Sequence, residues 1–197
     1  MGMTNGIQRH EIKLVEVNDA EFIIKLRNDP ELKKHLNFTS ASLEDQKEWI
    51  RAYKKREAKG EEYYFVIYEN GAKVGLYRLY EINSISFTIG SWLFSKCQYK
   101  SLPIISDLAI TNLGFENFKL PIMRFDVRKD NLRVLRYSAV KKPILFTEDV
   151  DRFYYILPTE QWKEAQDNIL KFFRIDRYYY QDFKNELISS FAKMLKE

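Results

Sequence analysis

The sequence predicts an α/β fold, in which a mixed sheet of about seven strands is flanked by helices and followed by a C-terminal helical extension. Three observations lead to this prediction. Segments that alternate apolar and polar residues recur along the chain and are typical of strands. Three of them, between Glu62 and Ser95, are joined by short turns, which indicates an antiparallel meander. An amphipathic helix then separates two further strands.

The N-terminal part reads as one strand followed by helices. Alternation predicts a strand over Glu11–Val17. Two short helical stretches follow, interrupted at Pro30. A longer helix is expected over Leu43–Ala58, because Ser42 with Asp45 three residues later forms a capping pattern.

The meander consists of three predicted strands, Glu62–Tyr68, Ala72–Ile82 and Ser84–Ser95. The first two are joined by Glu69-Asn70-Gly71, a typical hairpin turn. Gly75 lies inside the second strand, which predicts a bulge or a close backbone approach there.

The unit from Ser84 to Ser138 organises the rest of the chain. After its first strand comes a polar loop, Lys96–Leu102, and a helix that opens at Pro103 and ends near Lys119. A strand over Ile122–Val127 follows, and then a short helix after Asn131. A loop of backbone amides leading into a helix N-terminus is a natural site for an anion such as a phosphate, because the unpaired N–H groups and the helix dipole point the same way.

The C-terminal part reads as a hairpin and two helices. The hairpin strands are Ile144–Thr147 and Arg152–Leu157, and the last helix, Asp176–Leu195, carries apolar residues at helical spacing. We therefore divide the chain into a domain of residues 10–158 and a helical extension of residues 159–197. The extension is expected to pack on the domain or on a second copy of the chain.

Composition excludes several classes of function. The 32 Lys and Arg residues exceed the 28 Asp and Glu residues by only 4, and the charges are interspersed, so no nucleic-acid partner is expected. Cys97 is the single cysteine, so no intrachain disulfide can form, and neither histidine has metal-ligand spacing, so no metal site is expected. Without a membrane-length apolar run or a signal-like N-terminus, we expect a cytoplasmic protein with no membrane partner.

The order of elements and several short segments resemble the GNAT superfamily of acyl-CoA-dependent N-acetyltransferases. Within it the chain is most similar to the branch that contains ribosomal-protein and amino-sugar N-acetyltransferases. The similarity spans about Glu11 to Leu157. No single matching segment identifies the family, but their occurrence together in this order is specific. The matching segments are 26–30, 46–50, 89–93, 115–116 with 120, and 126–131 with 134–136.

This resemblance implies a splayed sheet and acetyl-CoA as the co-substrate. The family's cofactor loop aligns with Gln98–Pro103, but Ser101 and Pro103 stand where the family has small residues, usually glycine. Glycine there lets the backbone approach the pyrophosphate, and proline lacks an N–H, so fewer amide donors are expected. The implied cofactor-binding residues are Leu93, Ser95, Gln98, Tyr99, Lys100, Ser101, Leu102 and Asn131.

The implied reaction is direct attack of an amine on the thioester, which needs a base, an oxyanion donor and an acid for the leaving thiolate. The family's base position falls at Thr88, so Glu81 is the candidate base. Tyr137 and Ser138 are candidate acids, and the Leu93 amide is the implied oxyanion donor. The structural alternatives are a solvated carboxylate at Glu81 and a core aromatic ring at Tyr137.

The expected function is transfer of an acetyl group from acetyl-CoA to a primary amine on a small molecule, with a nucleotide-linked amino sugar as the expected acceptor. A protein N-terminal acetyltransferase is one alternative, which an acidic acceptor cleft would favour. A degenerate GNAT domain that acts as a binding or regulatory module is the other, because the loop, base and acid positions all depart from the family pattern. The C-terminal helices would be the natural partner surface of such a module. A homodimer is a further expectation, in which the last helix packs on a second copy and not on its own domain.

Overall fold

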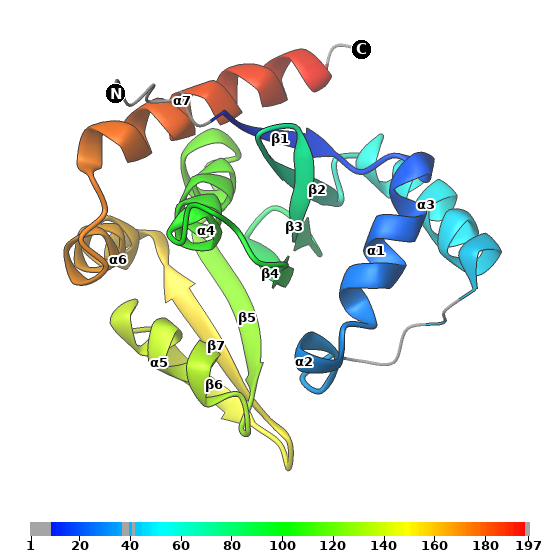
Figure 1. Ribbon diagram of the computed structural model, residues 1–197. Helices are drawn as coiled ribbons and strands as arrows, with labels where there is room; N and C mark the ends of the chain where they lie inside the picture. Colours follow the sequence, from blue (N-terminus) through cyan, green and yellow to red (C-terminus); the bar gives the residue numbers. More distant parts are fainter. Residues whose placement is uncertain (1–8, 37–39, 41, 196–197) are drawn as a thin grey trace, which may run out of the picture.

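A single seven-stranded sheet forms the centre of the molecule, with helices packed on both faces (Figure 1). The computed structural model describes residues 9–36, 40 and 42–195. The strand order is β1-β2-β3-β4-β5-β7-β6, which confirms the predicted α/β class and mixed sheet. The strands are β1 His10–Leu14, β2 Tyr63–Glu69, β3 Ala72–Tyr80, β4 Ser86–Phe94, β5 Ile122–Arg128, β6 Ile144–Glu148 and β7 Arg152–Pro158.

Strand pairing is antiparallel throughout this sheet except between β4 and β5. These two strands run parallel because a helix connects them, which parallel neighbours require. They pair only from Ser86 to Thr88 on β4, opposite Ile122 to Arg124 on β5. Beyond that level they separate, which confirms the splayed sheet that the resemblance implied.

The helices divide between the two faces of the sheet. Helices α1 and α3 pack together on one face, while α4 and α7 lie on the other, with α7 running across α4 and β1 (Figure 1). In the part of the chain that the structure describes, no helix is long and apolar enough to cross a bilayer. The helices are α1 Ala20–Arg27, α2 Pro30–Lys33, α3 Leu43–Glu57, α4 Leu102–Asn112, α5 Leu132–Val140, α6 Thr159–Phe172 and α7 Arg177–Met194, with a 3₁₀ turn η1 Val17–Asp19 and a π-helical turn η2 Leu113–Asn117.

Several boundaries differ from the sequence-based expectation: β1 ends at Leu14 and not at Val17, and β3 ends at Tyr80 and not at Ile82. Two further differences have a local reason. Strand β4 begins at Ser86 and not at Ser84, because the Asn83 side chain accepts hydrogen bonds from the amides of Ile85 and Ser86 and closes a turn. Helix α4 ends at Asn112 and not near Lys119, because the next residues form the π-helical turn η2. In this turn the Phe118 amide donates to the Leu113 carbonyl, five residues earlier.

Each face of the sheet has its own hydrophobic core, because alternate residues of a strand point to opposite faces. On β2, Phe65 and Ile67 join the core under α4 and α7, whereas Tyr64 and Val66 join the core under α1 and α3. Helices α6 and α7 belong to the first core. They are tied to α4 at Asn112, whose amide group bonds the side chains of Trp162 and Tyr180.

Candidate active site

A bulge in the middle of β4 creates the opening around which the site is built. Leu76 pairs with Leu93 and Arg78 pairs with Gly90, so β4 has one residue more than β3 between these pairs. Ser91, inside the bulge, has a φ of 48°, which is uncommon for a residue other than glycine. Bulges of this kind redirect side chains and end strand pairing near active sites. Here the bulge lies just beyond the level at which β4 leaves β5.

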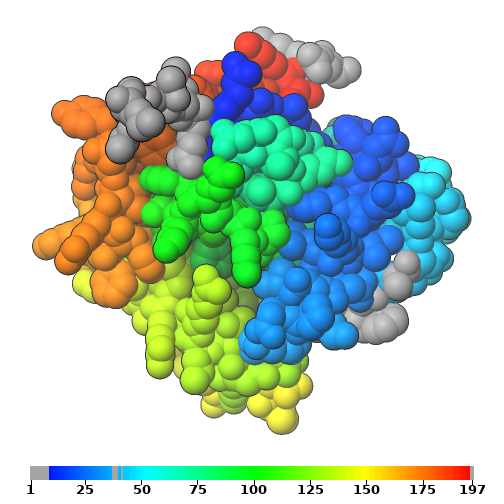
Figure 2. All heavy atoms as spheres, in the orientation of Figure 1, coloured from blue at the N-terminus to red at the C-terminus, as the bar shows by residue number. Residues whose placement is uncertain are grey.

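The first pocket, which we call the splay cavity, lies between the separated ends of β4 and β5 and has a volume of about 140 Å³. Figure 2 shows the surface hollowed between the loop before α4 and helix α5. Backbone from β4 and side chains from α4 and α5 line this cavity, including Trp92, Asn131, Tyr137 and Ser138. An opening between two unpaired strand edges offers backbone hydrogen-bonding groups to an extended amide-containing ligand.

A buried cluster of charged and phenolic groups forms one wall of the splay cavity. Asp107 and Lys141 are 1% and 3% exposed and form an ion pair of 2.7 Å. Tyr77 donates to Oδ1 of Asp107 at 2.5 Å, and Tyr137 donates to Oδ2. Burial and the negative charge of Asp107 raise the pKa of both phenols well above their ordinary value. We call these four residues the Asp107 cluster.

This geometry bears on the two candidate acids. The Tyr137 hydroxyl is already engaged as a donor to Asp107, so proton transfer from it to a thiolate competes with that hydrogen bond. Ser138 is buried and also lines the splay cavity. Both residues therefore lie at the cavity, while their roles as acids stay predictions.

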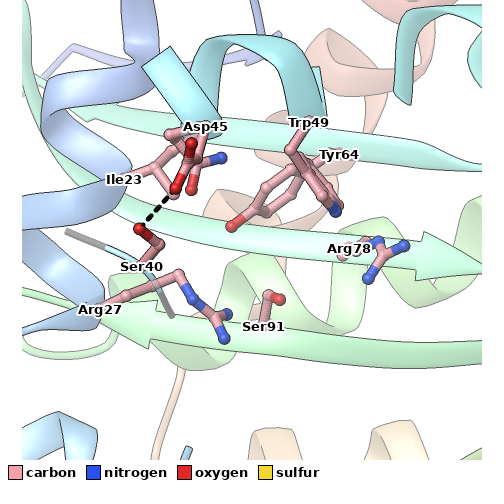
Figure 3. A pocket seen from close by; sticks show the side chains of 9 residues that line it. Ile23, Arg27, Ser40, Asp45, Trp49, Tyr64, Arg78 and Ser91 are labelled. Atoms are coloured by element: carbon pink, nitrogen blue, oxygen red, sulfur yellow. Dashed lines mark hydrogen bonds between the residues drawn. The ribbon is translucent and has the colours of Figure 1, made fainter. Parts of the chain in front are cut away.

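The second pocket, which we call the acceptor pocket, lies on the other face of the sheet and has a volume of about 300 Å³. Figure 3 shows its walls: Arg27 from α1, Trp49 from α3, Tyr64 from β2 and Arg78 from β3. The Arg78 guanidinium lies 5.2 Å from the centre of the Trp49 ring and is held by Glu62 at 2.5 Å. Two guanidinium groups beside aromatic rings can bind an anion and a flat ring together.

Ser91 lines both pockets, so the two pockets approach each other at the bulge of β4. Tyr64 is buried on the acceptor side, and burial raises the pKa of its phenol against the opposing effect of the Arg27 guanidinium. Ligands bound in the two pockets would lie on opposite sides of one strand opening. Group transfer between two bound molecules needs their reacting atoms close together, which adjoining pockets allow.

The predicted cofactor segment, Gln98–Pro103, overlaps the polar loop Lys96–Leu102 that leads into α4. The amides of Gln98 and Tyr99 donate to the Glu69 carboxylate, each at 2.7 Å, and the Leu102 amide donates to the Tyr99 carbonyl. Lys100 is exposed at the loop surface, and the Ser101 carbonyl accepts the amides of Ile104 and Ile105 at the start of α4.

The other predicted site residues lie in different environments. Asn131 caps α5 by accepting the Val134 amide and faces the splay cavity. The Leu93 side chain is buried in the core under α1 and α3. The amide and hydroxyl of Ser95 both donate to the Val74 carbonyl.

The candidate base Glu81 lies outside the residues that line the two pockets. Its carboxylate accepts a hydrogen bond of 2.9 Å from the Thr88 hydroxyl. The resemblance places the family's catalytic carboxylate at the position of Thr88. In this chain the carboxylate of Glu81, from the turn after β3, lies next to that position. Its role as a base stays a prediction.

Sequence reasoning missed Asp107, Lys141 and the two pocket arginines. Asp107 had a signal, since it is the single charged residue in the apolar helix segment Pro103–Leu113 and a buried carboxylate needs a partner. Lys141 had no such signal in the sequence. It is followed directly by a second lysine, Lys142, which pairs with Glu164 at the surface, and no local pattern distinguishes the two.

The family model for the acetyltransferase (GNAT) domain matches residues 9–139, and the chain belongs to this family. It is therefore an acyl-CoA-dependent N-acyltransferase, and the splayed sheet agrees with this class. GNAT acetyltransferases use acetyl-CoA.

Three comparisons place the chain among known members. FdhC in its apo form, described as a nucleotide-linked sugar GNAT, is 35% identical and superposes with a TM-score of 0.71, covering 80% of this chain and 90% of FdhC. Acetyltransferase PseH from Campylobacter jejuni is 28% identical over 138 residues, which are 70% of this chain and 84% of PseH. The crystal structure of Campylobacter jejuni N-acetyltransferase PseH has a TM-score of 0.57 at 21% identity, covering 76% of this chain and 97% of that chain.

Proposed function

We propose that this chain transfers the acetyl group of acetyl-CoA to a primary amine on a nucleotide-linked amino sugar. The single observation that carries this proposal is that the splay cavity and the acceptor pocket meet at Ser91. The thioester would arrive from one face of the sheet and the amine from the other. The similarity to FdhC, described as a nucleotide-linked sugar GNAT, supports the acceptor class.

For the cofactor, we propose that the pantetheine arm lies in the splay cavity and that the pyrophosphate lies at the loop before α4. The amides of Lys100 and Ser101 are the proposed pyrophosphate donors, since Glu69 engages those of Gln98 and Tyr99. The lysine side chains of the loop, Lys96 and Lys100, would add charge. The remaining contacts predicted for Leu93, Ser95, Leu102 and Asn131 stay part of this proposal.

For the acceptor, the chemistry of the pocket favours an anionic substrate over a basic peptide. Arg27 and Arg78 are the cationic lining side chains, and Asp45, whose carboxylate accepts a hydrogen bond from Ser40 at 2.8 Å, is the acidic one. Arg78 pairs with Glu62, but Arg56 pairs with the same carboxylate, so these three side chains keep one net positive charge beside the pocket. Guanidinium groups bind diphosphates in bidentate fashion, and the Trp49 ring offers a face to a base or a sugar. The protein N-terminal acetyltransferase is therefore the second candidate.

In the proposed reaction the amine nitrogen attacks the thioester carbonyl carbon and the C–S bond breaks. The amine loses one proton, to Glu81 through water, and the thiolate gains one, from Ser138 or Tyr137. The Leu93 amide is the proposed oxyanion donor.

The test is CoA release from acetyl-CoA, followed with a thiol-reactive dye, across a panel of acceptors. The panel contains nucleotide-linked amino sugars, the same sugars without the nucleotide, and a peptide with a free N-terminus. Release with the nucleotide-linked sugars alone is the expected result. Release with the peptide alone would support the second candidate, and CoA binding without release from any acceptor would support a degenerate binding module.

A substitution pair tests the acceptor pocket itself. Arg78→Met should raise the KM for the nucleotide-linked sugar by about 10-fold or more and leave the KM for acetyl-CoA unchanged, since a hydrogen bond to a charged group contributes about 1.5–3 kcal/mol. Arg133→Met, an exposed arginine on α5 outside the acceptor pocket, is the matched control. Equal effects of the two variants would contradict the assignment of Arg78. The predicted homodimer is measured separately, by sedimentation of the wild-type chain.

A further inference from the structure

A buried carboxylate occupies part of the backbone that the cofactor loop would otherwise present to a phosphate. Glu69 ends β2 and is 5% exposed. Its Oε2 accepts the Gln98 amide and its Oε1 accepts the Tyr99 amide, each at 2.7 Å. Burial alone would raise the pKa of Glu69, but the amides of Tyr99 and Gln98, together with His10, outweigh burial and lower the pKa, so the group is a carboxylate at neutral pH.

A histidine and a tyrosine extend this contact to the C-terminal helix. His10 on β1 has Nε2 at 3.6 Å from Oε1 of Glu69, which is beyond hydrogen-bond distance and leaves the buried Nε2 without a hydrogen-bond partner among the described residues, so this link is an electrostatic contact. Its Nδ1 is hydrogen-bonded to the Tyr179 hydroxyl of α7. Burial lowers the pKa of His10 although Glu69 acts to raise it, so the imidazole is neutral at pH 7. We assign the hydroxyl of Tyr179 as the donor to Nδ1, which leaves the proton of the ring on Nε2, facing Glu69.

The aromatic rings of these residues pack against the loop as well. Tyr99, in the loop, lies with its ring centre 5.5 Å from that of His10 and 5.2 Å from that of Tyr179. The loop is therefore held by two backbone amides that donate to Glu69 and by ring contacts with β1 and α7. Ser101 and Pro103 stand where the family pattern has small residues, and their side chains restrict the backbone conformations of the loop. The contacts from Glu69, β1 and α7 fix one conformation of this restricted loop.

We propose that Glu69, His10 and Tyr179 form a strap that holds the cofactor loop in its binding conformation, so that helix α7 contributes to acyl-CoA affinity. The proposal rests on the proposed function, in that the loop before α4 is taken to bind the pyrophosphate. A loop that is already ordered loses less conformational freedom when the ligand binds. The three residues are positioning residues and touch neither the thioester nor the amine.

The strap predicts the opposite of a simple charge effect. Glu69 carries a negative charge near a site for a negatively charged ligand, so removal of its charge would tighten CoA binding if the carboxylate acted only by repulsion. If the strap holds the loop, the same substitution weakens CoA binding, because the glutamine side chain has one acceptor oxygen for two amides.

The experiment is calorimetric titration of CoA into the wild type, Glu69→Gln and Tyr179→Phe, with pantetheine, which lacks the pyrophosphate, as the second probe. We expect the Kd for CoA to rise about 10-fold in Glu69→Gln and a few-fold in Tyr179→Phe, with pantetheine binding unchanged. Glu11→Gln, which removes a surface carboxylate paired with Lys13 beside His10, is the matched control and should change neither.

The outcomes are separable. An unchanged or lower Kd for CoA in folded Glu69→Gln overturns the strap, and so does an equal loss of CoA and pantetheine binding, which would indicate general distortion. If Glu69→Gln does not fold, Tyr179→Phe decides, because it removes one hydroxyl and leaves the carboxylate in place. A wild type that fails to bind CoA overturns the proposed function instead, before any variant is compared.

Discussion

Replacing Asp107 by asparagine should be one of the most destabilising polar substitutions in this chain. The carboxylate receives the hydroxyls of Tyr77 and Tyr137 and the ammonium of Lys141 on its two oxygens. Asparagine keeps one acceptor oxygen and turns an N–H₂ group toward the remaining donors. The substitution leaves the charge of Lys141, 3% exposed, without its partner.

The expected cost is about 3–5 kcal/mol in the free energy of unfolding, the range for removing one partner of a buried pair. For a chain of this length, each kcal/mol lowers Tm by roughly 2–4 °C, so the expected loss is about 6–20 °C. The assay is urea unfolding followed by tryptophan fluorescence, with thermal unfolding alongside.

A second substitution separates the effect of the unpaired buried charge from that of the lost hydrogen bonds. Asp107→Asn combined with Lys141→Met should recover at least half of the lost stability, since the orphaned charge is gone. Glu164→Gln, which breaks the exposed pair with the neighbouring Lys142, is the matched control and should leave Tm unchanged. A loss below about 1 kcal/mol for Asp107→Asn, or strict additivity in the double variant, would refute the reasoning.

Three further predictions concern the site and its loop. Trp49→Ala should raise the KM for a nucleotide-linked acceptor by about 10-fold, since ring stacking contributes about 1–3 kcal/mol, and should not affect the KM for acetyl-CoA. Tyr178→Ala, which removes an 85% exposed ring on α7, is the control. Burial and the charge of Glu69 raise the pKa of the Cys97 thiol to about 11, so alkylation by iodoacetamide at pH 8 should be about 100-fold slower in the folded chain than in urea; equal rates would contradict this. Because the folded pKa of Glu69 lies below its ordinary value, its contribution to stability is present above about pH 4.5 and is lost as the pH falls through the folded pKa. Urea unfolding between pH 3 and 6 should therefore show a weaker pH dependence in Glu69→Gln than in the wild type, and identical slopes would count against the two amide contacts.

Much of the fold follows from local patterns. Alternation predicted the meander, and the Glu69-Asn70-Gly71 turn joins β2 to β3 as expected. Ser42 caps α3 by accepting the Asp45 amide, which matches the capping pattern. Gly75 lies against the ring of Phe94, where an added Cβ would overlap the ring, so its predicted close approach is confirmed.

The sites depended on contacts that no local pattern encodes. Periodicity indicates that a residue is buried, but it does not indicate which side chain from another element will meet it. Asp107 meets Lys141 across two helices, and Glu69 meets the loop 29 and 30 residues later. His10 and Tyr179 are separated by 169 residues.

The sequence by itself determined the α/β class, the strand–loop–helix–strand frame and the family resemblance, because each depends on residue types at short and regular spacing. Only the tertiary structure decided that Ser91 joins two pockets, that Tyr137 donates to Asp107 and that Glu69 engages the cofactor loop. The physical reason is that hydrogen bonds and ion pairs act over a few ångströms in space, so their partners are set by how the sheet and helices close together.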